Sequence, residues 1–87
     1  MRNKLIVFSP EFLEDLSFWV KVERKTASKI LELVNHVMRY PFEGIGKPEP
    51  LKHIGNDIWS RRITSEHRLV YLVLDDRIEF IQCRFHY

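Results

Sequence analysis

The sequence predicts a single α+β domain in which a helical hairpin packs on one face of a twisted antiparallel sheet. The chain has 87 residues, a length that suits one compact domain with a small core. Its first half carries apolar residues at helical spacing, and its second half carries short strand-like runs separated by turn residues. The expected order is one strand, two helices, and then three or four antiparallel strands. One face of the sheet would remain free.

The first strand is expected at Leu5–Phe8, a run of β-branched and aromatic residues. Ser9 then suits the N-cap of a helix that begins at Pro10, because the first helical position does not need a backbone N–H. Acidic residues close to this end would complement the helix dipole. The apolar stripe expected to face the core contains Phe12, Leu13, Leu16, Trp19 and Val20.

A second helix is expected after the charged break at residues 21–25, with Thr26 as its cap. It must end near Tyr40, because Pro41 disfavours helical geometry in the residue before it. Residues 41–50 hold three of the four prolines and two of the three glycines, which predicts an extended loop. The apolar stripe of this helix contains Ala27, Ile30, Leu31, Val34 and Met38.

The second half has four strand-like runs, at residues 51–54, 58–64, 68–74 and 78–85, from which three or four strands are expected. The turn near Ser65 leaves two registers open. A three-residue turn at residues 64–66 would pair Ile63 with His67 and put Arg62 and Arg68 on one sheet face. A two-residue turn at residues 65–66 would put them on opposite faces, and the sequence does not choose between the two.

The charge balance indicates little by itself, because 14 Lys and Arg against 12 Asp and Glu give a net charge of only +2. The basic residues are concentrated between positions 47 and 68, where two histidines are interleaved with them. The lone cysteine, Cys83, cannot form an internal disulfide, and no signal peptide or membrane anchor is visible. We therefore expect a cytoplasmic protein. The basic residues of this stretch are Lys47, Lys52, Arg61, Arg62 and Arg68.

Several kinds of site are not indicated by the sequence. The four histidines lack metal-ligand spacing, and there is no phosphate-binding glycine loop or nucleophile elbow, so we expect neither a metal nor a cofactor. Cys83 lies in an apolar run and is expected to be a small buried side chain rather than a nucleophile. His36, within the second helix, is expected to be a surface or half-buried side chain.

The remaining polar residues fit one chemistry, which is RNA cleavage without a metal. In that reaction the ribose 2′-hydroxyl attacks its own phosphate, and it needs a base, an acid for the leaving 5′-oxygen, and cations around the phosphorane. Glu49, His86 and the arginines could supply these groups. An imidazole suits the reaction because it can hold or release a proton near neutral pH.

Five blocks of residues, in order along the chain, carry a family resemblance. They are Pro41-Phe42-Glu43-Gly44, Gly46-Lys47-Pro48-Glu49-Pro50-Leu51-Lys52-His53, Trp59-Ser60-Arg61-Arg62-Ile63, Glu66-His67-Arg68-Leu69-Val70-Tyr71 and Cys83-Arg84-Phe85-His86-Tyr87. Together they closely resemble the YoeB toxin family, within the wider RelE and ParE superfamily. The likeness runs from Leu5 to the last residue.

The resemblance implies a RelE/YoeB-like, microbial-ribonuclease-like fold and a homodimeric toxin. It also implies a ribosome-dependent messenger RNA interferase that cuts in the ribosomal A site and is silenced by a YefM-like antitoxin. By position, Glu49 resembles the general base, His86 the general acid and Arg68 the phosphate clamp. The expected RNA contacts are Lys52, Arg62 and Tyr87 from the resemblance, together with Lys47 and Arg61 of the basic stretch.

Two other functions remain open on this scaffold. ParE-like relatives share the fold but poison DNA gyrase, and they lack the acid and base residues. A plain RNA-binding domain would bind through the basic stretch and leave every phosphodiester intact. Glu49, Arg68 and His86 favour the nuclease over both.

Overall fold

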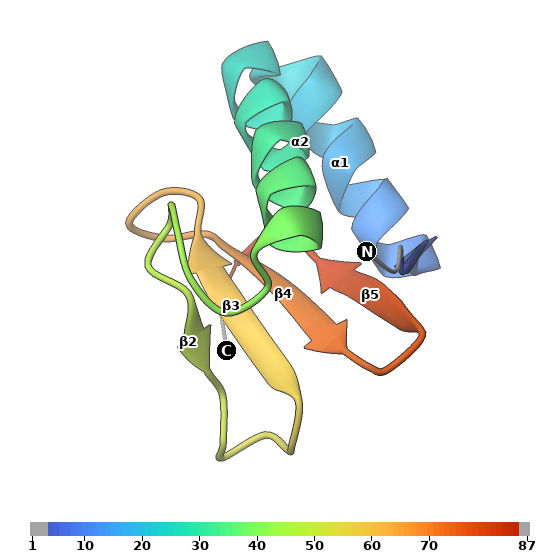
Figure 1. Ribbon diagram of the computed structural model, residues 1–87. Helices are drawn as coiled ribbons and strands as arrows, with labels where there is room; N and C mark the ends of the chain where they lie inside the picture. The colour runs from blue at the N-terminus through green and yellow to red at the C-terminus, as the bar shows by residue number, and fades with distance from the viewer. Residues whose placement is uncertain (1–3, 86–87) are drawn as a thin grey trace.

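The computed structural model describes residues 4–85 and confirms the α+β class. The five strands form one sheet in the order β1-β5-β4-β3-β2, and the helices α1 and α2 lie side by side against the sheet (Figure 1). Pairing is antiparallel from β2 to β5, as predicted, whereas β1 joins β5 in parallel and makes the sheet mixed. The elements in chain order are β1 (Leu5–Phe8), α1 (Pro10–Val22), α2 (Arg24–Arg39), β2 (Glu49–Pro50), β3 (Ile58–Arg62), β4 (Arg68–Val73) and β5 (Arg77–Gln82).

The start of α1 follows its local signals. The Ser9 hydroxyl accepts a hydrogen bond from the Phe12 N–H at 3.0 Å, which confirms Ser9 as the N-cap. The same hydroxyl donates to the Ile81 carbonyl at 2.7 Å and so ties the helix start to the end of β5. The predicted stripe is correct for the buried Phe12 but too wide, since Leu13 is 51% exposed.

The second helix begins earlier than predicted, because the break between the helices is the single residue Glu23. Thr26 is therefore not the cap. It lies buried in the first turn of α2, where its hydroxyl bonds to the Glu23 carboxylate at 2.7 Å. The buried stripe is also rotated from the predicted one, since Leu31 is 47% exposed while Leu33 and Val37 are buried.

The predicted strand at residues 51–54 is wrong. Those residues form a turn in which the Leu51 carbonyl accepts from the N–H groups of Ile54 and Gly55. The strand lies just before it, as the two-residue β2, where Glu49 pairs with Ser60. Because β2 is an edge strand, its Pro50 can lack an N–H without breaking the sheet.

The turn between β3 and β4 settles the open register. Arg62 pairs with Arg68, and the Ile63 N–H donates to the His67 carbonyl at 2.9 Å, so the turn is the three-residue one. The Thr64 hydroxyl stabilises it by accepting from the N–H groups of Glu66 and His67. Arg62 and Arg68 therefore lie opposite each other on one sheet face.

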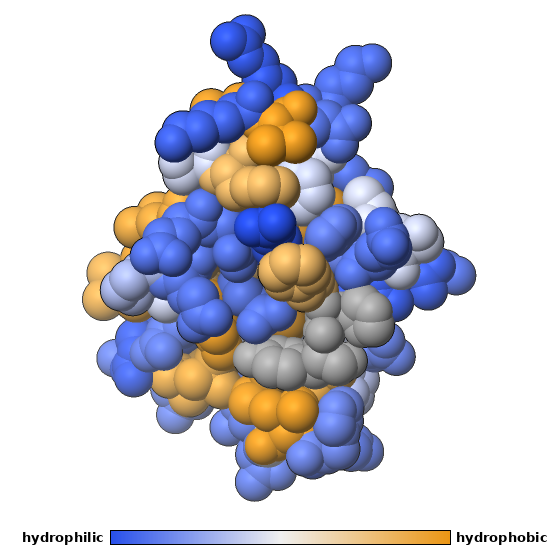
Figure 2. All heavy atoms as spheres, turned by 180° about the vertical axis from the view of Figure 1, so that it is seen from behind, coloured by the Kyte–Doolittle hydropathy of each residue, from blue (hydrophilic) through white to orange (hydrophobic). Residues whose placement is uncertain are grey.

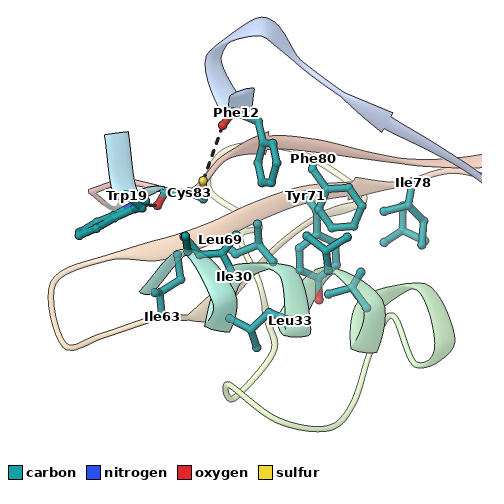
Figure 3. Close-up of a cluster of buried hydrophobic side chains, with 14 residues drawn as sticks. Phe12, Trp19, Ile30, Leu33, Ile63, Leu69, Tyr71, Ile78, Phe80 and Cys83 are labelled. Carbon is teal, nitrogen blue, oxygen red and sulfur yellow. Dashed lines mark hydrogen bonds between the residues drawn. The ribbon is translucent and has the colours of Figure 1, made fainter. Parts of the chain in front are cut away.

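The core lies between the helices and one sheet face (Figure 3). Cys83 is fully buried there, as predicted, and its thiol lies 3.7 Å from the Phe12 carbonyl. Apolar side chains on the side drawn in Figure 2 gather in small separate groups among hydrophilic ones. Among the described residues no helix is both long and apolar enough to cross a membrane.

Candidate functional site

A cleft of about 300 Å³ opens beside β2, on the sheet face that Arg62 and Arg68 share. Strand pairing builds it: Glu49 of β2 lies beside Ser60 of β3, which lies beside Val70 of β4. Arg68 stands two residues before Val70 and so projects from the same face. The sheet therefore brings the predicted base Glu49 and the predicted clamp Arg68 into one cleft. It is lined by Glu49, Pro50, Leu51, His53, Ser60, Arg68 and Val70.

Arg68 as a residue is half-buried, and one guanidinium nitrogen donates to the Thr64 carbonyl at 3.1 Å in an exposed hydrogen bond. Within residues 4–85 no carboxylate forms an ion pair with it. A guanidinium carries more N–H donors than this single bond uses. Arg68 can therefore still bind an anion such as a phosphate in the cleft.

The end of the described chain is attached to the same residue. The Phe85 carbonyl accepts from the Arg68 N–H at 2.8 Å. Just before it, the Trp19 indole N–H donates to the Cys83 carbonyl at 2.9 Å, and the Arg84 guanidinium lies 3.5 Å from the centre of the Phe18 ring. The predicted acid His86 and the predicted contact Tyr87 lie outside the described residues.

Three other predicted RNA contacts, Arg62, Lys47 and Lys52, do not line this cleft. Arg62 and Lys47 border a second cavity of about 460 Å³, whose apolar wall includes Leu33 and Ile63. Lys52 is exposed in the turn after β2 and lines neither cavity. Arg62 is thus the cross-strand neighbour of Arg68 and also borders the second cavity.

The placement of Arg61 contradicts the RNA contact predicted for it. Arg61 is fully buried on the helix side of the sheet, where its guanidinium binds the chain between α2 and β2. It donates to the Tyr71 hydroxyl at 3.1 Å and to the imidazole Nδ1 of His36 at 3.1 Å. It also donates to three loop carbonyls, those of Tyr40, Glu43 and Ile45. Alternation along β3 explains the error, since neighbouring residues point to opposite faces.

Tyr71 completes this buried network. Its hydroxyl donates to the Pro41 carbonyl at 2.8 Å while it accepts from Arg61. Burial raises the pKa of the Tyr71 hydroxyl, although the hydrogen bond from Arg61 opposes the shift. A protonated hydroxyl is what the bond to Pro41 requires, so the network is consistent with a fixed loop ahead of Glu49.

Gly44 allows this loop to approach α2 closely. Its φ is +115°, and a Cβ there would lie 2.2 Å from the Cε1 atom of His36. Only glycine fits both the backbone conformation and the space. His36 is half-buried, as predicted, and its ring nitrogen bonds to Arg61.

Two residues that line the cleft beside β2, hereafter the Glu49 cleft, were assigned no role from the sequence. His53 is exposed in the turn after β2, and Ser60 is buried beside Glu49 in the sheet. His53 was visible as a histidine within the basic stretch, but nothing local linked it to Glu49. Ser60 could be found only from the pairing of β2 with β3.

Residues 4–85 contain no group of three histidine, cysteine or acidic side chains placed to hold a metal ion. The one cysteine of the sequence, Cys83, carries a buried free thiol. Burial, and secondarily the Asp15 carboxylate, raises the pKa of Cys83 to about 12. The thiol is therefore neutral at physiological pH and is unsuited to nucleophilic attack.

Comparisons with known proteins agree with the fold and with the residue blocks. A family model described as a YoeB-like toxin of bacterial type II toxin-antitoxin systems matches residues 8–87. The Escherichia coli protein Toxin YoeB is 49% identical over 82 residues, which cover 94% of this chain and 98% of that protein.

Two solved structures from Staphylococcus aureus are also similar. A YoeB dimer has a TM-score of 0.88, and a YoeB-YefM complex has a TM-score of 0.82. Both are 42% identical in sequence, and each match covers 99% of this chain and 100% of the other.

Proposed function

The chain belongs to the YoeB family of toxins from bacterial type II toxin-antitoxin systems, and we propose on that basis that it is an endoribonuclease that cleaves messenger RNA on the ribosome. The observation that carries the proposal is the shared cleft of Glu49 and Arg68, with the Phe85 carbonyl hydrogen-bonded to the Arg68 backbone. A carboxylate and a guanidinium around a space of about 300 Å³ suit one ribose and its phosphate.

The proposed reaction is an internal transfer of the phosphate. The Glu49 carboxylate takes the proton of the 2′-hydroxyl, and the resulting oxygen attacks the adjacent phosphorus. Arg68 stabilises the negative charge of the phosphorane. The bond to the 5′-oxygen then breaks, and His86 gives that oxygen its proton. The products are a 2′,3′-cyclic phosphate and a free 5′-hydroxyl, and the step needs neither water nor a metal ion.

The remaining basic residues would bind the RNA backbone outside the reaction centre. Arg62 beside Arg68, Lys47 at the second cavity and Lys52 in the exposed turn would contact flanking phosphates, and Tyr87 is proposed as a further contact. Such contacts predict cleavage that weakens as salt rises. The buried Arg61 has no part in RNA binding.

The ribosome is proposed to hold the RNA in the attack-ready geometry that a shallow cleft cannot impose alone. This role requires the chain to act in the cytoplasm. The solved complexes of relatives support two more proposals, a homodimer and neutralisation by a YefM-like antitoxin.

The test is primer extension on messenger RNA translated in a purified system. We expect Glu49→Gln, Arg68→Gln and His86→Gln each to lower cleavage by roughly a hundredfold or more, the usual scale for losing a positioned acid, base or charge donor. Glu43→Gln and Arg39→Gln, at exposed positions that line neither cavity, are the matched controls and should leave cleavage unchanged.

Two results would overturn the proposal. One is full cleavage by all three cleft and chain-end variants. The other is an absence of cleavage by the native chain. Inhibition of DNA supercoiling by gyrase would then indicate the ParE-like function, and RNA binding without cleavage would indicate a plain binding module.

A further inference from the structure

We propose that His67 is a positioning residue for the proposed acid, because its Nδ1 accepts the hydrogen bond that holds the backbone N–H of Phe85. The inference rests on the proposed nuclease function, because the proposed acid His86 directly follows Phe85 in the chain. His67 itself does not line the Glu49 cleft, so its role would be indirect.

Two consecutive residues of the β3–β4 hairpin hold Phe85 by both of its backbone polar groups. The Phe85 N–H donates to His67 Nδ1 at 2.8 Å, and the Phe85 carbonyl accepts from the Arg68 N–H at 2.8 Å. The Phe85 side chain is 59% exposed, so burial contributes little to its placement. The Phe85 ring lies 5.8 Å from the His67 ring and 4.7 Å from the Arg84 guanidinium, and the two hydrogen bonds fix the backbone of Phe85 directly.

The backbone of Phe85 also needs such support. Its φ is +64°, in the left-handed region, where the Cβ of an L-residue crowds its own carbonyl. A bulky residue stays in this conformation only when its surroundings over-determine it, and such residues cluster at functional sites. A residue in the left-handed region changes the direction of the chain. Fixing the backbone of Phe85 therefore fixes the attachment point of the next residue, His86.

Contacts other than the one with Phe85 also fix the position of His67. Its ring packs edge to face against Trp19, with 4.8 Å between ring centres. The backbone N–H of His67 donates to the Thr64 hydroxyl, and the backbone carbonyl of His67 accepts from the N–H groups of Ile63 and Thr64. The turn therefore fixes the backbone of His67. To accept from Phe85, Nδ1 must carry no proton, which leaves the ring hydrogen on Nε2.

Two roles for His67 can be separated by substitution. A positioning role needs an acceptor at the place of Nδ1, whereas a packing role needs only the flat ring against Trp19 and Phe85. In His67→Asn the amide oxygen takes the place of Nδ1, and in His67→Gln the amide group instead reaches the place of Nε2. His67→Phe keeps the ring and removes the acceptor.

The experiment measures messenger RNA cleavage on ribosomes over a range of ribosome concentrations, for the native chain and the three variants. We expect His67→Phe and His67→Gln to lower the maximal rate roughly tenfold to a hundredfold, a scale typical of a misplaced reacting group. The half-saturating ribosome concentration should not change. His67→Asn should stay within about threefold of the native rate.

Amide hydrogen exchange of Phe85 gives a second readout that does not depend on activity. The amide should be protected in the native chain and in His67→Asn, and unprotected in His67→Phe and His67→Gln. Should His67→Phe fail to fold, the Asn and Gln pair still decides the question, since both are polar and of similar size.

Failure of this inference differs from failure of the proposed function. A native chain that cleaves, together with a His67→Gln variant that cleaves at the same rate, overturns the positioning role alone. Equal losses in His67→Asn and His67→Gln also overturn it, because the acceptor would then not matter. A native chain that never cleaves overturns the nuclease and this inference with it.

Discussion

Replacing Arg61 with methionine should destabilise the fold strongly, whereas the same change at the neighbouring Arg62 should not. Methionine keeps much of the length of the side chain and removes every donor. The Arg61 guanidinium serves five acceptors, of which three are carbonyls of the loop at residues 40–45. No other donor to those three carbonyls is found within residues 4–85.

The expected loss in free energy of unfolding follows from the carbonyls that Arg61→Met leaves without a donor. A buried acceptor left without a partner costs about 1 to 3 kcal/mol, and water can reach part of this exposed loop. We therefore expect Arg61→Met to lower the free energy of unfolding by about 3 to 5 kcal/mol. The whole fold of such a chain is stable by only about 4 to 13 kcal/mol. Arg61→Lys offers three donors for five acceptors, so its loss should be intermediate, about 2 kcal/mol.

Urea unfolding followed by tryptophan fluorescence measures these differences. With a slope of about 1 to 2 kcal/mol per molar urea, the midpoint of Arg61→Met should fall by about 1.5 to 5 M. Arg62→Met, at an exposed position on the other face of β3, should stay within about 0.5 kcal/mol of the native chain. Equal midpoints for Arg61→Met and Arg62→Met would refute the structural role assigned to Arg61.

Two further predictions concern the helix start and the buried thiol. Ser9→Ala should lower the free energy of unfolding by about 1 to 2 kcal/mol, because it removes the cap of α1 and the bond to Ile81, whereas Ser17→Ala on the exposed face of α1 should change it little. Urea midpoints compare the two. Cys83 should resist alkylation in the native chain at pH 8 and react fully in denaturant. Its folded pKa of about 12 lies above the unfolded value of 9.0, so the stability from the neutral thiol is complete below pH 9 and is lost as pH rises toward 12. Cys83→Ala should lack this alkaline loss, and an equal loss in both proteins would contradict the assignment.

Local signals predicted the parts of the fold that local chemistry determines. The Ser9-Pro10 pair located the start of α1, because a capping hydroxyl and a residue without an N–H satisfy that helix end within a few residues. The α2 start was missed, since it has no side-chain cap bond to recognise. Leu31 was misassigned to the core because the chosen stripe lay about one residue to the side of the face that meets the sheet.

Pairing between distant segments decided the features that the sequence could not supply. Residues 51–54 have strand-like composition, yet they form a turn because β2 pairs through Glu49 and Pro50. The adjacent arginines of β3 show the same limit. Alternation says that Arg61 and Arg62 point to opposite faces, but only the carbonyl-lined loop beneath α2 determines that Arg61 is the buried one.

The composition of the cleft likewise depends on strand register, which the turn between β3 and β4 determines. Glu49 and Arg68 share a sheet face because the turn between β3 and β4 has three residues, which pairs Arg62 with Arg68. A slip of one residue would move every side chain of β4 to the other face. Arg68 would then point into the core, and the buried Leu69 would point into the cleft. The Thr64 hydroxyl, which accepts from two backbone N–H groups of this turn, therefore supports the register on which the proposed chemistry depends.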